Sequence, residues 1–410
     1  MQIDEDALEE ALRDPQTWEA VDLLRSRPAR IREALMLKAR IDAEDAAAAR
    51  LLSPLLRSPL RFRNAAIARN PKAQTAGVVR YLCAAAHERH EKRPEFSLEL
   101  TLCAYDVALT LGPASSPSQR FCMALSLRER ANALRYLGRF TEALEALDAA
   151  EKLFDETPAA DPHDIAIVQL IRATVLVESE HLEDARLLSR KAASVFSQYG
   201  DRPRELVALH VEATSLHYGG KNDKAATAYE RLAAKARVDG DRNLLARALN
   251  GAGSAYLDLD KLDEAESSLI DALVIFDELN LATERVRVAW SLALILVRRG
   301  DLDGGAIRLD AVRTDLERLG VVNDHALATL DWAFARLAMG QPSGVAAACR
   351  RIAVRFESEG MMKSARIALA HLHEALAAGR ATPTLVSEIR EYLEHLPAHP
   401  DAPFIFSAGS

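Results

Sequence analysis

The sequence has 410 residues, of which 49% are hydrophobic, 5% aromatic and 27% charged, and its net charge is −8. The low aromatic content and the abundance of Ala, Leu, Glu and Arg exclude an all-β protein and favour helices. The mildly acidic charge balance excludes a protein that binds nucleic acid over its whole surface.

The cysteines and the terminus indicate the compartment. The first residues, MQIDEDALEEAL, lack the basic and apolar segments of an export signal. The longest apolar run, Val288–Val297, is too short to cross a bilayer. No CxxC spacing occurs among the four cysteines, which are typical of buried thiols in a reduced protein. We therefore expect a cytoplasmic protein without a membrane segment.

Residues 1–73 do not follow the repeat described below and are expected to form a short helical N-terminal region. Residues 46–87 contain no Asp or Glu but seven Arg and Lys side chains, and Pro54, Pro59 and Pro71 prevent one continuous helix. This basic window is either a contact patch for an acidic partner or nucleic acid, or a solvated face of a capping region. We favour the solvated face, because charge clusters are common on surfaces, and we expect no nucleic-acid partner.

From Gln74 onward the sequence is predicted to form helix pairs. The first pair, Thr75–His90 with Glu95–Leu111, is followed by a Pro- and Ser-rich joint at 112–119. Six further pairs follow, and the residues at their turns are 42 residues apart in the first step and 40 apart in the next four. These turn residues are Gly138, Glu180, Gly220, Asp260, Gly300 and Gly340.

Small residues and helix ends follow the same period. Seven residues before each turn residue stands a small one: Ala131, Ala173, Ala213, Gly253, Ala293 and Ala333. Five residues after it stands another, with one exception: Ala143, Ala185, Ala225, Ala265, Gly305 and then Val345. The second helices are predicted to end at Gly200, Gly240, Asn280, Gly320 and Gly360. Because each pair has an apolar face that only the next pair can cover, this pattern predicts a solenoid.

The central unit carries a resemblance to a known family. Leu249, Gly253, Tyr256, Ala265, Leu269 and Ala272 stand at signature positions of the tetratricopeptide repeat, and unit Leu127–Phe154 matches in the same way. The 40-residue period, longer than the usual 34 or so, resembles repeats of bacterial regulatory proteins and kinesin light chains. The resemblance covers residues 74–396 and implies an all-α fold, a right-handed α-α superhelix. We expect Met361–Ala378 and Thr384–Leu396 to cap the array and residues 397–410 to form an extended tail.

In this family the concave face is lined by repeat positions two, five, nine and twelve. The resemblance therefore implies a peptide-binding or partner-binding groove formed by Arg128, Asn132, Arg135, His210, Thr214, His217, Arg247, Asn250, Ser254, Arg287, Trp290 and Phe334. Its first part is polar and suited to hydrogen bonds with a peptide backbone. The stretch from Trp290 to Leu337 is apolar, and it is either a partner site or a surface covered by the superhelix or the tail.

Part of this groove resembles the family's carboxylate clamp for peptide C-termini. Arg128 and Asn132 match half of that clamp, but Ile171, Val207 and Val211 occupy its other positions. We therefore do not expect a binder of chaperone tails.

No motif for phosphate binding, dinucleotide binding, metalloprotease or serine hydrolase chemistry is present. His87 and His90 with Cys83 could form a metal site, but a buried cysteine beside two surface histidines explains the same residues. We expect no catalytic residues, no metal and no cofactor.

The sequence therefore predicts a non-enzymatic scaffold or adaptor that binds a peptide or a partner helix in its concave groove. The alternative is a sensory or regulatory subunit of a bacterial signalling or transcription-control system that binds a peptide or a small effector. An enzyme built around Cys83–His90 ranks last. The sequence does not indicate an oligomeric state.

Overall fold

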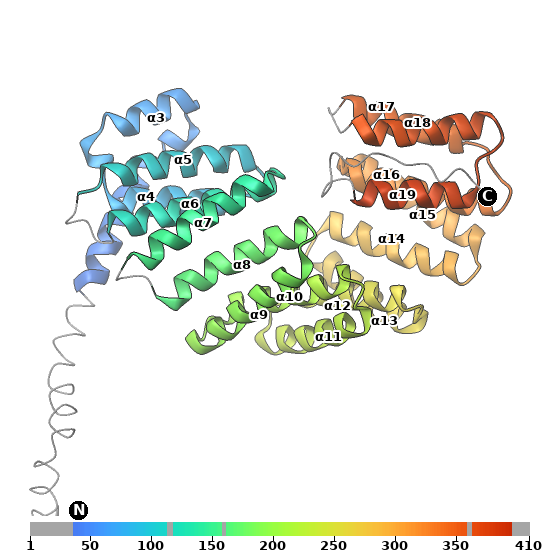
Figure 1. The fold of residues 1–410 in the computed structure, drawn as a ribbon, viewed down its shortest axis with the longest axis horizontal. Coiled ribbons are helices and arrows are strands. Elements are labelled where there is room, and N and C mark those ends of the chain that lie inside the picture. The colour runs from blue at the N-terminus through green and yellow to red at the C-terminus, as the bar shows by residue number, and fades with distance from the viewer. Residues whose placement is uncertain (1–35, 113–117, 158–160, 359–362, 396–410) are drawn as a thin grey trace, which may run out of the picture. The chain divides into compact units, whose positions relative to one another are not determined.

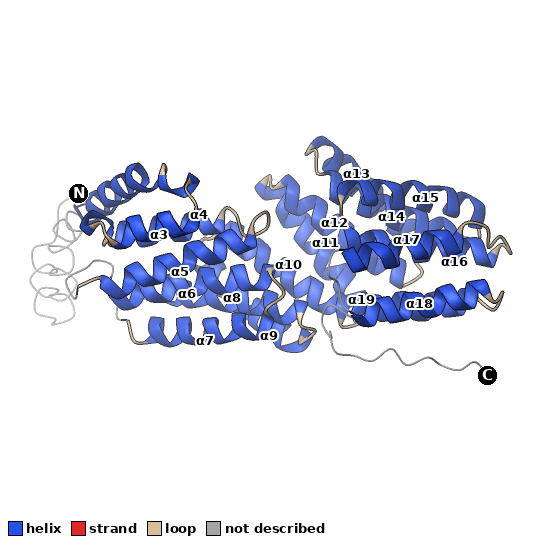
Figure 2. Cartoon of the chain, turned by 90° about the horizontal axis from the view of Figure 1, so that it is seen from above, coloured by secondary structure: helices blue, strands red, loops and turns tan. Residues whose placement is uncertain are grey.

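The computed structural model describes residues 36–112, 118–157, 161–358 and 363–395, which are mostly helical and contain no strand (Figure 2). The chain divides into two compact units, residues 1–161 (unit 1) and 162–410 (unit 2). Each is described by itself. The boundaries predicted at residues 73 and 396 stay a prediction.

Unit 1 begins, in its described part, with a helix over residues 36–52. The following elements are η1 (Leu55–Arg57), α3 (Leu60–Ala68), η2 (Pro71–Ala73), α4 (Ala76–His87), α5 (Pro94–Thr110), α6 (Gln119–Tyr136) and α7 (Phe140–Asp155). Pro54 and Pro59 are the N-caps of η1 and α3, and Pro71 opens η2. The basic window is therefore broken at its prolines as predicted. The helices expected before residue 36 lie outside the described residues.

Unit 2 is a run of helix pairs whose first members are α8, α10, α12, α14 and α16 (Figure 1). Its elements are α8 (Pro162–Glu178), α9 (Leu182–Tyr199), α10 (Arg202–Tyr218), α11 (Asn222–Asp239), α12 (Arg242–Asp258), α13 (Leu262–Glu278), α14 (Ala282–Arg298), α15 (Leu302–Leu319), α16 (Val322–Ala338), α17 (Val345–Ser358), α18 (Lys363–Ala377) and α19 (Pro383–His395).

All six predicted turn residues have positive φ angles, between 56° and 85°. Two of them, Glu180 (φ 61°) and Asp260 (φ 56°), are not glycine, so they adopt the left-handed conformation against the preference of their Cβ atoms. The second helices also end in this conformation at Gly200, Gly240 and Gly320, and Asn280 has φ 56°. Four of the five predicted ends are thus confirmed, and Gly360 lies outside the described residues.

The small residues allow the two helices of a pair to approach closely. A Cβ atom on Gly253 would lie 2.6 Å from Cγ of Leu269 on α13, which is too close for any larger side chain without movement. The equivalent residues of the other pairs, Ala131, Ala173, Ala213, Ala293 and Ala333, are fully buried. The predicted packing of each pair is therefore confirmed.

The first helices of unit 2 lie along the inner side of its curve. Each contacts the next first helix directly, from α8 through α10, α12 and α14 to α16. Helices α10, α12, α14 and α16 each also pack against the second helix on either side, and α8 packs against α9, which fills the core between repeats. We call the side of unit 2 formed by these first helices the inner face.

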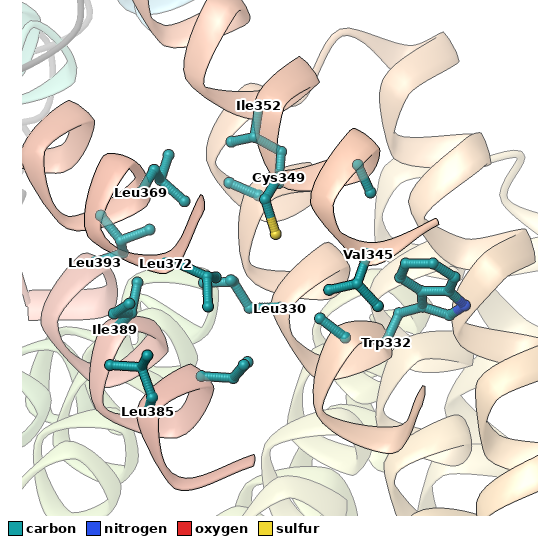
Figure 3. Packing of buried hydrophobic residues seen from close by; sticks show 14 of the residues in the cluster. Leu330, Trp332, Val345, Cys349, Ile352, Leu369, Leu372, Leu385, Ile389 and Leu393 are labelled. Atoms are coloured by element: carbon teal, nitrogen blue, oxygen red, sulfur yellow. The ribbon is translucent and has the colours of Figure 1, made fainter. Parts of the chain in front are cut away.

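Helix α19 leaves the stacking order. Its main neighbour is α16, although it also contacts α18, and the capping role of α18 and α19 stays a prediction. Leu385, Ile389 and Leu393 of α19 are buried against Leu330 of α16 in one apolar cluster (Figure 3). The periodic pattern could not reveal this, because an amphipathic helix fits either position. The tail that follows lies outside the described residues.

Candidate functional site: the inner face of unit 2

One position in each repeat is predicted to line the inner face. Because successive repeats are 40 residues long, equivalent positions form a row across the first helices. This row consists of Leu170, His210, Asn250, Trp290 and Leu330. A second row, four residues further along each helix, consists of Thr174, Thr214, Ser254, Leu294 and Phe334. Both rows change from polar at α10 and α12 to apolar at α14 and α16.

The polar part holds two buried atoms that lack a hydrogen-bond partner within the described residues, Nδ1 of His210 and Oδ1 of Asn250. Burial and the charge of Arg247 lower the pKa of His210 to about 4, so its imidazole is neutral at pH 7. The hydroxyl of Thr214 is engaged with that of Tyr229 at 2.9 Å. Because unpartnered buried polar atoms are costly, these two are candidates for contact with a polar ligand.

The charged residues predicted for the groove tie neighbouring repeats together. Arg247 donates to Glu284 at 3.2 Å and Arg287 to Asp324 at 2.6 Å, in each case across to the next first helix. His217 lies 2.9 Å from Asp258 in the same manner. The two arginine side chains remain close to half exposed, so they line the face while they also join the repeats.

Helix α19 packs against the α16 end of the apolar part. Trp290 donates its indole N–H to Asp331 at 2.8 Å, and the same carboxylate receives Nε of Arg390 from α19 at 2.6 Å. Burial raises the pKa of Asp331 to about 6, although Arg390 opposes that rise. Phe334 and Leu337 are half-buried and pack against the apolar cluster that contains α19. Helix α19 therefore packs on the α16 end of this stripe, at Leu330.

The far end of α19 reaches the opposite side of the inner face. Nδ1 of His395 lies 3.0 Å from Oε1 of Glu180, the turn residue after α8, although the two are 215 residues apart. This hydrogen bond raises the pKa of His395, with smaller contributions from Glu394 and Glu391. Helix α19 therefore crosses the inner face from α16 to the end of α8.

Three predicted site residues belong to unit 1 and form a separate candidate surface on α6. Arg128 is mostly buried and forms an ion pair with Glu129 at 2.9 Å. Asn132 accepts a hydrogen bond from Arg135 at 3.1 Å, and Arg135 also stacks over Tyr136 at 3.9 Å. Since Arg128 is already engaged by Glu129, it is not poised as half of a carboxylate clamp.

Among the described residues, one group of side chains comes within metal-binding distance: His87, His90 and Glu129. The sequence interpretation placed Cys83 beside the two histidines, whereas the structure places Glu129 there. Cys83 instead contacts the hydroxyl of Ser126, 3.8 Å away, and burial raises its pKa so that it stays a thiol.

Sequence reasoning missed the four residues that hold α19: Asp331, Arg390, Glu180 and His395. Asp331 had a signal, because it is the single acidic residue within the mostly apolar stretch LATLDWAFARLA. A buried carboxylate of this kind requires a partner. The other three residues carry no such signal, since their contacts join segments far apart in the chain.

No family model matches the sequence, and no curated protein matches it. The structure does match solved structures. A signal transduction ATPase with a tetratricopeptide repeat sensor from Pyrococcus horikoshii is 14% identical, with a TM-score of 0.57, over 87% of this chain and 53% of that one. The chain has the tetratricopeptide-type solenoid fold.

Rap proteins share this fold with the chain. Aspartyl phosphate phosphatase F from Bacillus subtilis is 12% identical, with a TM-score of 0.54, over 90% of this chain and 97% of its own. A Rap protein in complex with competence and sporulation factor is 14% identical, with a TM-score of 0.53, over 87% of this chain and 99% of its own. At these identities the likeness concerns the fold and not the ligand.

None of the described helices combines the length and the apolar character that crossing a bilayer requires.

Proposed function

We propose that this protein is a non-enzymatic interaction protein that binds a peptide or a partner helix on the inner face of unit 2. The single observation that carries the proposal is α19, which lies on this face as a bound helix would. Helix-in-groove recognition uses apolar side chains at one-turn spacing, and Val386, Ile389 and Leu393 of α19 provide that pattern.

The contacts of α19 indicate the chemistry of the partner. Arg390 supplies a cation to Asp331, and His395 supplies a second donor to Glu180. The partner is therefore an amphipathic helix with an apolar stripe, a basic residue one position after the apolar residue equivalent to Ile389, and a polar donor near its end. Such a helix would replace α19 on α16.

The polar part of the face supports a second contact. His210 and Asn250 stand side by side in the repeat order and each offers an unpartnered buried atom. An extended peptide segment beyond the partner helix would supply amide groups to these atoms.

The test is competition by a peptide with the sequence of α19, Pro383–His395, carrying a fluorophore. We expect the peptide to bind the Ile389→Ala variant of the full chain more tightly than the unaltered chain, because the variant's own α19 is weakened. A peptide in which Arg390 is replaced by Glu is the matched control and should bind at least tenfold more weakly. Equal binding of both peptides, or of both proteins, would contradict the proposal.

A second candidate function is a sensory or regulatory subunit that responds to a peptide. It is favoured by the fold shared with Rap proteins, one of which is solved with competence and sporulation factor and another with the Phr* peptide. Here the bound peptide would change the curvature of unit 2 by displacing α19. Hydrogen exchange of the repeats α8–α13 that changes when the α19 peptide binds would favour this function, and a change confined to α19 would favour a simple adaptor.

A further inference from the structure

We propose that His87, His90 and Glu129 of unit 1 form a binding site for a divalent transition-metal ion of the zinc class. His87 is the last residue of α4, His90 lies in the turn that follows, and Glu129 lies on α6. Helices α4 and α6 pack directly against each other, which brings the turn and the carboxylate together.

Two of the three distances between the ligand atoms are close to those around one metal ion. Nδ1 of His87 lies 3.1 Å and Nε2 of His90 lies 3.2 Å from the same oxygen, Oε2 of Glu129. All three ligand atoms lie within 4.8 Å of one another. Zinc bonds of about 2.0–2.2 Å at tetrahedral angles place neighbouring ligand atoms about 3.3 Å apart. Adjustments of a few tenths of an ångström in these two distances would therefore match that spacing.

The surroundings favour a bound cation with one open position. The side chains of His90 and Glu129 are 3% and 6% exposed, whereas that of His87 is 69% exposed. The buried pair excludes water from two sides, and the exposed imidazole leaves a path for the ion and for water as a fourth ligand. Two nitrogen ligands, one carboxylate and one open position form a common zinc coordination set.

A neighbouring residue orients the carboxylate. Nε and Nη2 of Arg128 contact Oε1 of Glu129 at 3.0 and 2.9 Å, which leaves Oε2 turned toward the two imidazoles. Burial opposes ionisation of Glu129, but Arg128 and the hydrogen bonds from the imidazoles outweigh it and hold the pKa of Glu129 well below its usual range. The ring of Tyr136 stacks on His90 at 6.2 Å and limits its rotation. Partners of this kind around a metal ligand commonly change affinity by about 10- to 100-fold.

Metal binding also requires a change of tautomer in both imidazoles. With neutral imidazoles, the hydrogen bonds to Oε2 place the protons on Nδ1 of His87 and Nε2 of His90. When the ion binds these two atoms, each proton moves to the other nitrogen of its own ring, so that a lone pair faces the metal. Nδ1 of His90 is buried and has no hydrogen-bond partner within the described residues, so it can accept that proton.

The competing explanation is an ion-pair network in which Glu129 is neutralised by Arg128 and the histidines without any metal. Calorimetric titration of the full chain with Zn²⁺ separates the two. We expect one equivalent to bind, with affinity reduced at least 100-fold in Glu129→Gln and in His87→Ala, and by about 10- to 100-fold in Arg128→Ala. His87 is exposed, so its substitution leaves the core intact if Glu129→Gln fails to fold. His371→Asn, on α18 of unit 2, is the control for adventitious binding by a surface histidine and should bind as the unaltered chain does.

Cobalt provides a second measurement. Co²⁺ should give the intense visible bands of a tetrahedral site without a thiolate charge-transfer band, because Cys83 is not a ligand. No binding at one equivalent, binding that His87→Ala leaves unchanged, or a thiolate band would each overturn the proposal.

Discussion

The docking of α19 on the inner face leads to a quantitative prediction for Ile389→Ala. Ile389 is fully buried in the apolar cluster between α16 and α19. Replacing a buried isoleucine by alanine costs about 2–5 kcal/mol. Because α19 lies outside the helix stack, this cost falls on its docking and not on the folding of α8–α16. The population in which α19 is undocked should therefore rise by about 30- to 5,000-fold.

Hydrogen exchange measured by mass spectrometry follows this change directly. The amides of residues 385–395 should lose protection in Ile389→Ala, whereas those of α12 should keep theirs. Ser387→Ala, at an exposed position of the same helix, is the matched control and should leave exchange unaltered. The reasoning is refuted if α19 exchanges at the original rate, or if α12 loses protection by the same factor, because α19 would then be part of the cooperative core.

Three further predictions concern the repeats and the contact between His395 and Glu180. Gly253→Val should lower the free energy of unfolding by about 1–3 kcal/mol in urea titrations, because its side chain would collide with Leu269. Asp260→Val should lower the same quantity by about 1–2 kcal/mol, since a β-branched residue resists the positive φ of this turn. Protection of α19 against exchange should weaken as pH rises above about 6.5. His395 has a raised pKa when docked, so its contribution is complete below the undocked pKa and lost as pH passes through the docked one.

Each of these predictions has a matched control. Ser267→Ala, at an exposed position of α13, should change the unfolding free energy by less than about 0.5 kcal/mol. Asp260→Gly should be neutral or stabilising, and a loss equal to that of Asp260→Val would show that the backbone conformation is not the cause. In His395→Gln the pH dependence above 6.5 should disappear, and its persistence would assign it to other groups.

The repeats could be predicted because the residues that form each turn and each close helix contact lie within a single repeat. Glu180, Asp260 and Asn280 stand where other repeats carry glycine. The period alone placed the first two at turns and the third at a helix end, and all three have positive φ angles. The close contact between Gly253 and Leu269 also lies within one repeat, since the two residues belong to the same helix pair. A pattern that recurs every 40 residues thus includes both helices of a pair and the contact between them.

The candidate sites were less predictable, because they depend on contacts that do not recur. Glu129 meets His87 42 residues earlier, one step of the repeat, so the first-to-first helix spacing could have revealed it. The contact between His395 and Glu180 spans 215 residues and follows from how far unit 2 curves, a quantity that accumulates from small rotations in every repeat. The sequence does not indicate that Arg390 pairs with Asp331, because arginine is common on helix surfaces.

The crossing of α19 has a mechanical consequence for unit 2. A stack of helix pairs behaves as a spring, whose small rotations between neighbours add to a large change in the distance between its ends. Helix α19 is bonded to α16 through Arg390 and Asp331, and at its C-terminal end to the turn after α8 through His395 and Glu180. It therefore works as a strut that holds this spring at one length, and a force or ligand that breaks either fastening would soften all the repeats between them at once.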